Sequence, residues 1–248
     1  MARVVHEQNV PKRVVHVIGN GDGAPLYLRK PRKGLKLACN QIQFEVPEKW
    51  ATVMVDFKMM DTLMRYHNGD RSNGLSISGN WVLGYRPKRW MEAKPGFHMA
   101  KSNQIREFYT DLPQYTYDRS KGEDMGMGYT NWNCGHMATH YAANRLRAEE
   151  IHLYGFDSVF DFNMNSFTDL VLESDRGLMN SQRLSSNWRP IWEHMFKEWP
   201  EVKFVFHHTH DKFKIKTQSN VACITYPKSE RQLDRPEDVD FDQLGTTE

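Results

Sequence analysis

Short apolar runs, each followed by a polar or glycine-rich stretch, recur along the whole chain. The first, VVHVI at residues 14–18, is rich in β-branched residues and predicts a strand that is buried on both faces. Runs at 36–39 and 51–57 predict the second and third strands. Three later strands are predicted at 151–154, 202–206 and 221–226. We expect the strand at 14–18 to lie at the centre of a mainly parallel sheet, because fully buried strands are typical of such sheets.

Stretches with helical periodicity separate these runs. KMMDTLMRYH at 58–67 repeats apolar residues at helical spacing, and residues 135–147 pair small and aromatic side chains four positions apart. Ser186 has the character of an N-cap before a third helix, which carries Trp188, Trp192 and Trp199 on one side. Strands and helices in alternation predict a single α/β domain over residues 1–228, a doubly wound, Rossmann-like nucleotide-binding fold.

Two internal stretches show no clear period. Residues 69–130 are rich in glycine, proline, aromatic and basic residues, and only GLSISGNWVL at 74–83 has strand character. We expect an inserted irregular subdomain there on the acceptor side. Residues 158–185 are polar with scattered Met and Phe, which is consistent with a lid. The last residues, 229–248, form an acidic tail that we expect to be peripheral.

The composition is that of an ordinary soluble domain. A length of 248 residues allows one full core, and no apolar run is long enough to cross a bilayer. The first residues lack the continuous apolar segment of a secretory signal. Three widely spaced cysteines fit reduced thiols. We therefore expect a cytoplasmic protein without a membrane partner.

The net charge of +2 conceals basic regions at 1–45 and 65–121. The second region contains YRPKRW at 85–90, in which aromatic and basic residues are interleaved. This combination favours a polyanionic partner such as nucleic acid, although a solvated basic surface has the same composition. The predicted nucleic-acid contacts are Arg86, Lys88, Arg89 and Trp90.

Three predicted strands end in polar residues, namely Asn20, Asn40 and Asp56. The first of these ends lies within GNGDG at 19–23, where glycines let backbone N–H groups approach a ligand closely. In open α/β sheets the carboxyl ends of the strands bind phosphorylated ligands, which makes a nucleotide the first candidate. A tight glycine turn without any ligand is the alternative interpretation.

Four segments, in this order, resemble the bacterial sialyltransferases that use CMP-sialic acid, and more broadly glycosyltransferases built on one nucleotide-binding α/β domain. The segments are VIGNGDG, CNQIQFE, VMVDFKMM and NCGHMATHYAANRLRAEEIHLYGFD. Residues 69–130 and the tail have no counterpart in this resemblance. The resemblance implies a nucleotide-sugar donor, either UDP- or CMP-linked, and transfer of its sugar to a hydroxyl group.

The resemblance also implies which residues hold the donor. Asn20 and the loop glycines would follow its phosphate and ribose, and the amide side chains after the second strand would hold a sugar. The turn that opens the helix at 134 would contact the nucleotide, and two lid arginines would clamp the departing phosphate. The full donor set is Gly19, Asn20, Gly21, Gly23, Asn40, Gln41, Cys134, Gly135, Asp157, Arg176 and Arg183.

The catalytic base departs from the family pattern. The family takes a histidine from the loop before the late helix, where this chain has Ser185 and Ser186. Asp56, at a strand end beside the expected donor, is the leading candidate for the base, and His136 is the second. Asp56 could equally cap the helix that follows it or bind a donor hydroxyl.

No metal site is predicted. In FHHTHD at 206–211, adjacent histidines on a strand point to opposite faces, so only His208 and His210 could converge. Residues 1–228 also lack a D-x-D pair for a divalent ion on a diphosphate, and the pairs at 238–240 and 240–242 lie in the tail that we expect to be peripheral. These observations favour a transferase that requires no metal.

The basic regions and the resemblance together lead to a specific hypothesis. A glycosyltransferase with basic residues near its site suits a hydroxyl acceptor carried by a polyanion, such as 5-hydroxymethylcytosine in double-stranded DNA, as in phage-type DNA modification. One alternative is sialyltransferase-like transfer to a surface glycan. Another is a nucleotide- or nucleic-acid-binding module without catalysis, which the missing family histidine favours.

Overall fold

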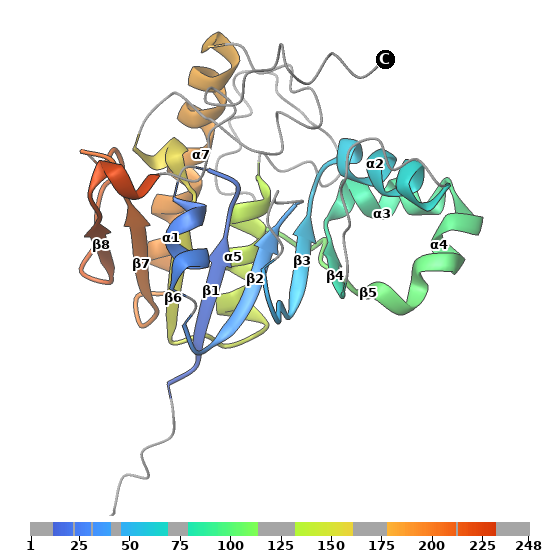
Figure 1. The fold of residues 1–248 in the computed structure, drawn as a ribbon, viewed down its shortest axis with the longest axis horizontal. Coiled ribbons are helices and arrows are strands. Elements are labelled where there is room, and N and C mark those ends of the chain that lie inside the picture. The colour runs from blue at the N-terminus through green and yellow to red at the C-terminus, as the bar shows by residue number, and fades with distance from the viewer. Residues whose placement is uncertain are drawn as a thin grey trace, which may run out of the picture.

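The chain folds around one eight-stranded sheet in which every pair of neighbouring strands is parallel (Figure 1). This computed structural model describes residues 12–21, 23–30, 32–40, 46–68, 79–113, 132–160, 178–211 and 213–231, without the side chains of 58, 66, 157, 178–187 and 231. The strands are β1 Val14–Ile18, β2 Leu35–Cys39, β3 Ala51–Met54, β4 Trp81–Leu83, β5 Ile105–Phe108, β6 Glu150–Tyr154, β7 Lys203–His208 and β8 Val221–Thr225.

The order of the strands, β5-β4-β3-β2-β1-β6-β7-β8, is that of a doubly wound sheet. β1 lies at the centre, between β2 and β6, as its nearly all-apolar run predicts. The chain winds outward from β1 to β5, then crosses back to β6 and winds outward again to β8. The topological switch point therefore lies between β1 and β6, where open α/β sheets bind ligands.

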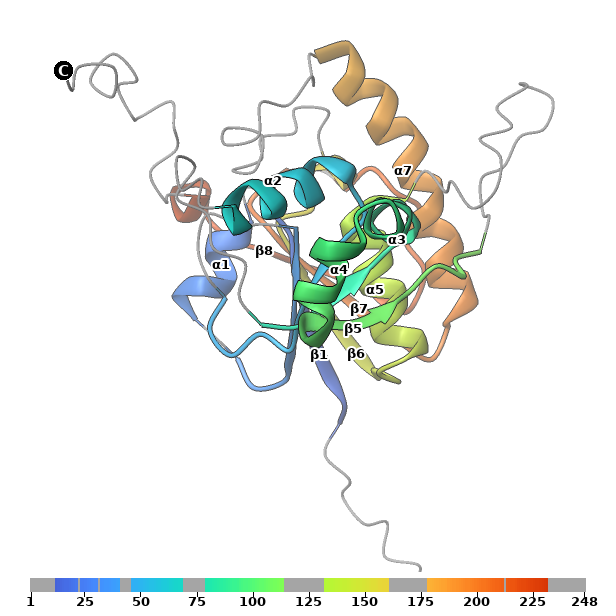
Figure 2. The same ribbon diagram turned by 90° about the vertical axis from the view of Figure 1, so that its right-hand side faces the viewer.

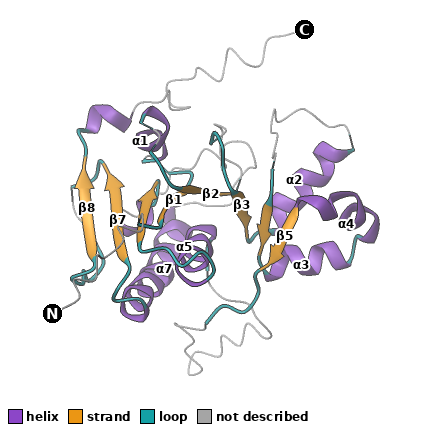
Figure 3. Cartoon of the chain, turned by 90° about the horizontal axis from the view of Figure 1, so that it is seen from below, coloured by secondary structure: helices purple, strands orange, loops and turns teal. Residues whose placement is uncertain are grey.

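Helices cover both faces of the sheet (Figures 2 and 3). One face is covered by α5 and α7, and the opposite face by α1 together with a layer formed by α2, α3 and α4. The helices are α1 Ala24–Arg29, α2 Phe57–His67, α3 Tyr85–Glu92, α4 Pro95–Lys101, α5 Cys134–Asn144 and α7 Leu178–Glu198, with 3-10 turns η1 Ser102–Gln104, η3 Asp157–Val159 and η4 Lys228–Arg231.

Alternation along the strands divides the core into two layers. On β1, Val15 and Val17 pack in the large cluster under α5 and α7, whereas Ile18 packs under α1. His16 lies on the same face of the strand as Ile18 and is also buried. Burial on both faces explains why the run reads as continuous and apolar.

Residues 79–113 are more regular than the sequence predicts. They form β4, α3, α4 and β5, and both strands belong to the same sheet rather than to an inserted subdomain. β4 lies within the stretch 74–83 that has strand character in the sequence, whereas the four residues of β5 are too few to show a period. The rest of the predicted insertion, 69–78 and 114–131, lies outside the described residues.

The late helix starts earlier than predicted. α7 begins at Leu178, so Ser186 lies inside the helix instead of capping it. The first turns carry no apolar stripe, and the hydrophobic pattern therefore could not mark their start. Of the predicted lid, 178–185 is helical and 161–177 lies outside the described residues.

None of the helices in the described ranges is both long enough and apolar enough to cross a bilayer. Of the predicted acidic tail, the structure describes only residues up to 231, which end in η4.

Candidate functional site

The glycine loop after β1 packs against the loop after β6. The N–H of Gly19 donates to the carbonyl of Tyr154 at 2.7 Å, and the N–H of Gly21 donates to the carbonyl of Gly155 at 3.1 Å. A Cβ on Gly19 would lie only 2.6 Å from the oxygen of Gly155. The close approach of the two backbones thus requires glycine at position 19. The N–H groups of Gly19 and Gly21, which we expected to face a phosphate, instead donate to backbone carbonyls of the protein.

Gly23 has the same explanation. Its Cβ would lie 3.0 Å from the nitrogen of Gly155 and 3.1 Å from the carbonyl oxygen of His207. Asn20 stands half-buried at the carboxyl end of β1. The loop therefore closes the sheet at its switch point, and among its described residues Asn20 places a side chain at the edge.

Asn40 and Cys134 meet at the carboxyl edge of the sheet. Asn40 follows β2 in a left-handed conformation, with φ 54°, which asparagine tolerates better than most residues. The Sγ of Cys134 donates a hydrogen bond to the side-chain oxygen of Asn40 at 2.7 Å. Burial, with a contribution from the Asp56 carboxylate, raises the pKa of the Cys134 thiol. Cys134 is therefore a neutral hydrogen-bond donor and not a thiolate nucleophile.

His136 completes the N-terminal cap of α5. Its backbone N–H donates to the side-chain oxygen of Asn133 at 3.0 Å, and its ring Nδ1 accepts from the Asn133 N–H at 3.1 Å. The side chain is fully buried, and burial lowers its pKa to about 3. The predicted role of His136 as a catalytic group has no support in this placement, because no solvent or substrate reaches the ring.

Gly135 begins the same helix with a packing role. A Cβ at this position would overlap the ring of Phe156, which follows β6. The start of α5 thus lies directly against the switch point.

Asp56 and Arg86 supply charge to this edge. Asp56 follows β3 and its side chain is 45% exposed, while Arg86, near the start of α3, is 34% exposed. The guanidinium lies 3.8 Å from the carboxylate. Because Asp56 also acts electrostatically on Cys134, these side chains form one group. We call Asn40, Asp56, Arg86 and Cys134 the edge cluster.

The remaining predicted nucleic-acid residues lie on α3 and differ in exposure. Lys88 is partly exposed, and Arg89 is well exposed and pairs with Glu92 at 2.8 Å. Trp90 is 7% exposed and its indole N–H donates to Asp61 at 2.8 Å. Trp90 therefore packs between α2 and α4, and the structure gives it no free ring face for a base.

Four predicted donor residues cannot be placed in this cluster. Gln41 and Arg176 lie outside the described residues. Asp157 begins η3 and Arg183 lies within α7, but their side chains lie outside the description.

The histidines of β7 point to opposite faces, as strand alternation requires. His207 faces His152 and Tyr226, whereas His208 stacks on Phe160 with ring centroids 4.1 Å apart. His210 stacks on the same phenylalanine at 5.1 Å. Within the part of the chain that the structure describes, no three potential ligands are grouped to hold a metal ion.

Sequence reasoning missed two features that matter here. Gly155 is as important to the switch point as the glycines of the first loop, and its φ of +74° marks it structurally. His16 and His152 are direct partners in the register of β1 and β6. A histidine within an otherwise apolar strand was the available signal.

Comparisons with protein-family models, with curated proteins and with solved structures found no match for this chain. The fold and the edge cluster define an α/β protein with a single doubly wound parallel sheet, which carries the Asp56–Arg86 pair at its carboxyl edge.

Proposed function

We propose that the chain is a glycosyltransferase that moves a sugar from a nucleotide-sugar donor, UDP- or CMP-linked, to a hydroxyl acceptor. The observation that carries the proposal is Asp56. It offers an accessible carboxylate at the carboxyl end of a central strand, next to Arg86 and close to the start of α5. A general base needs such accessibility, and a doubly wound sheet binds nucleotides at this edge.

The start of α5 and Asn40 are the proposed donor contacts. The first N–H groups of this eleven-residue helix, those of Cys134 and Gly135, have no acceptor within the helix. They are suited to the donor phosphate, as helix N-termini favour anions. Arg86 adds a positive charge nearby, so the proposed reaction stabilises the leaving phosphate without a metal ion.

In the proposed reaction, Asp56 accepts the proton of the acceptor hydroxyl. The hydroxyl oxygen forms a bond to the anomeric carbon of the donor sugar as the bond from that carbon to the phosphate oxygen breaks. The nucleotide phosphate leaves with the bonding electron pair.

We propose 5-hydroxymethylcytosine in double-stranded DNA as the acceptor, in a phage-type modification. Residues 85–107 carry six lysines and arginines against two glutamates, and they fold beside the edge cluster. Phosphate contacts by such residues supply most of the affinity in sequence-independent DNA binding. Arg86 connects the two parts, since it pairs with Asp56 and starts the basic helix α3.

Asp56→Asn is expected to lower the rate of sugar transfer by about 100-fold or more, because the amide cannot accept the acceptor proton. Donor affinity should remain, since the amide keeps the shape of the side chain. The measurement is turnover with a panel of nucleotide sugars, together with calorimetric donor binding.

Glu92→Gln is the matched control, because Glu92 is also an exposed carboxylate paired with an arginine. It should leave turnover unchanged. Normal turnover in Asp56→Asn would remove Asp56 from the reaction. Donor binding by the wild type without any transfer or donor hydrolysis would replace the enzyme with a binding module.

The triple variant Arg86→Ala, Lys88→Ala and Arg89→Ala is expected to bind double-stranded DNA more weakly and with less salt dependence. The slope of log affinity against log salt should flatten by about 0.9 for each DNA phosphate that the variant no longer neutralises. The experiment is a salt titration of DNA binding, with transfer measured on plain and hydroxymethylcytosine-containing DNA.

A second triple variant, in which Lys197, Lys214 and Lys216 become alanine, serves as the control. These lysines are exposed and lie at the other end of the sheet, around α7 and β7. Equal losses in both triple variants would mean that DNA binds without a specific surface. Transfer to a free glycan, with no DNA binding, would replace the DNA acceptor with a glycan.

A further inference from the structure

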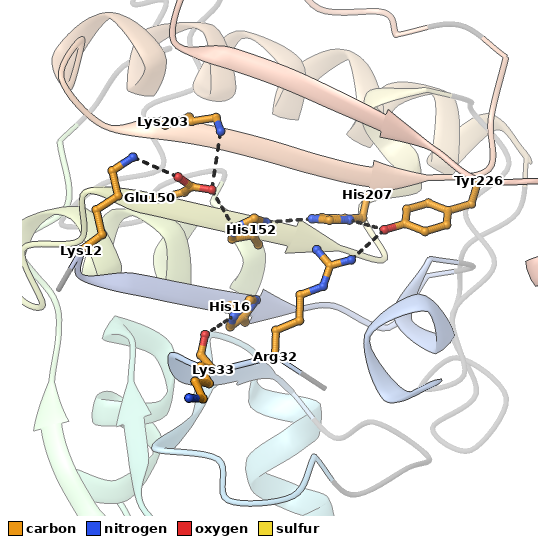
Figure 4. A network of polar contacts seen from close by, with 9 residues as sticks. All are labelled: Lys12, His16, Arg32, Lys33, Glu150, His152, Lys203, His207 and Tyr226. Carbon is orange, nitrogen blue, oxygen red and sulfur yellow. Dashed lines mark hydrogen bonds and ion pairs between the residues drawn. The ribbon is translucent and has the colours of Figure 1, made fainter. Parts of the chain in front are cut away.

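Three histidines form a row on the sheet face that carries α1, away from the edge cluster. His16 on β1, His152 on β6 and His207 on β7 come from three neighbouring strands (Figure 4). Ring centroids of His16 and His152 are 5.0 Å apart, and those of His152 and His207 are 5.1 Å apart. We call these residues the histidine row.

Two members of the row, His152 and His207, belong to a chain of hydrogen bonds in which the donors can point in only one direction. The Glu150 carboxylate can only accept, so His152 donates to it from Nε2 at 2.9 Å. The Nδ1 of neutral His152 then accepts from the Nε2–H of His207 at 2.8 Å. His207 Nδ1 in turn accepts the hydroxyl proton of Tyr226 at 2.9 Å, and the Tyr226 oxygen accepts from Arg32 at 3.1 Å.

This chain of hydrogen bonds requires neutral rings. A proton added to His152 or His207 would place an N–H on the nitrogen that accepts, and two donors would then face each other. Burial, with smaller contributions from the His152 ring and the Arg32 guanidinium, lowers the pKa of His16 to about 4 and that of His207 to about 3. The rings are thus neutral at pH 7.

The charged and titratable groups around the row come from every neighbouring element. Glu150 is the carboxylate at the end of the hydrogen-bonded chain and is also held by Lys12 and Lys203. Among the residues that the structure describes, these groups are Lys12, Tyr27, Arg32, Lys33, Lys36, Glu48, Glu150, Tyr154, Lys203, His208 and Tyr226. Apart from Glu150 and the more distant Glu48, the charged groups are positive, which opposes protonation of the row.

The hydrogen-bonded chain ties two distant segments of the protein to the sheet. Arg32 belongs to the connection between α1 and β2, and Tyr226 lies between β8 and η4. Besides its hydroxyl contacts, Tyr226 donates its backbone N–H to the carbonyl of His208 at 2.7 Å. Contacts between α1 and η4 complete the connection.

We propose that the histidine row is an acid-operated latch, which holds Tyr226 and Arg32 against the sheet while its rings are neutral and releases both segments when a ring takes up a proton. Opening gives the rings access to water, where a histidine has its ordinary pKa near 6.5. Each ring that is protonated on opening therefore favours the open state about tenfold more per pH unit below that value.

The test is hydrogen exchange of backbone amides in the full chain at pH 7 and pH 5.5, corrected for intrinsic exchange. We expect the protection of the Tyr226 amide to fall about tenfold more than that of amides in α2, because one proton per opening accounts for that factor. Equal changes at both places would overturn the latch.

Tyr226→Phe separates the latch from a merely structural contact. It keeps the ring and removes only the hydroxyl that donates to His207. Amide protection near Tyr226 should be low already at pH 7. The pKa of His207, followed by NMR of its ring, should rise because the neutral form loses a hydrogen bond.

Tyr141→Phe is the matched control, since it also removes one hydroxyl hydrogen bond, which Tyr141 on α5 donates to Glu107 at 3.0 Å. It should change neither the protection of the Tyr226 amide nor the pKa of His207. An unchanged His207 pKa in Tyr226→Phe would contradict the proposed direction of the hydrogen bonds and overturn the latch.

Discussion

Gly155→Ala is expected to lower the free energy of unfolding by about 3 kcal/mol or more, because alanine would have to adopt a left-handed backbone and its Cβ would clash with a neighbouring loop. Gly155 has φ +74°, and a Cβ there would lie 2.9 Å from the backbone nitrogen of Gly21. Neither backbone can move freely, since Gly21 also donates to Gly155. Urea unfolding of purified wild type and variant measures the difference.

Two other glycines separate the causes. Gly79 has φ +79° but its nearest neighbour is the Lys49 side chain at 3.9 Å, so Gly79→Ala should cost only about 1–2 kcal/mol from the backbone conformation. Gly96 lies in α4 with nothing within 4 Å, and Gly96→Ala should stabilise by about 0.5–1 kcal/mol. If Gly155→Ala costs no more than Gly79→Ala, close packing of the two loops is not essential.

The second large effect is loss of stability in mild acid. Four histidines are almost completely buried, and burial lowers the pKa of His16 and His140 to about 4 and of His136 and His207 to about 3. In each case the folded pKa lies below the unfolded value of 6.5. The stabilisation is therefore complete above pH 6.5 and is lost as pH falls through 6.5 towards the folded values.

Each of these histidines should remove about 2 kcal/mol between pH 7 and pH 5. Four together approach the roughly 5–15 kcal/mol that a domain has in total. Urea unfolding at a series of pH values measures the slope.

His140→Phe should reduce the slope of the unfolding free energy against pH by the amount that one bound proton contributes. His194→Gln, at an exposed position of α7, should leave this slope unchanged. A wild-type slope no steeper than one histidine produces would mean that these rings are hydrated in solution.

The sequence alone determined the central strands of the fold. β1, β6 and β7 are rich in apolar residues and largely buried because helices cover both sides of the sheet, and this burial leaves a local signature in the residues. The amphipathic spacing of α2 has the same origin, since one side of the helix packs on the sheet. Alternating strands and helices then limit the fold to the doubly wound class.

Elements without a local pattern were decided by the tertiary structure. β4 and β5 are three and four residues long, and they complete the sheet because β3 offers an edge to β4 and β4 in turn offers an edge to β5. The first turns of α7 have no apolar stripe to announce them. A backbone that gains its hydrogen bonds from distant segments leaves little trace in its own sequence.

The candidate site divides in the same way. The sequence places Asn40 and Asp56 at strand ends, because each follows an apolar run. Only the fold brings Arg86 within 3.8 Å of Asp56 and buries His136 and Trp90. Side-chain exposure depends on which elements pack together, and that depends on contacts between residues far apart in the chain. For the same reason the hydrogen-bonded row from Arg32 to Glu150 exists only in the folded protein.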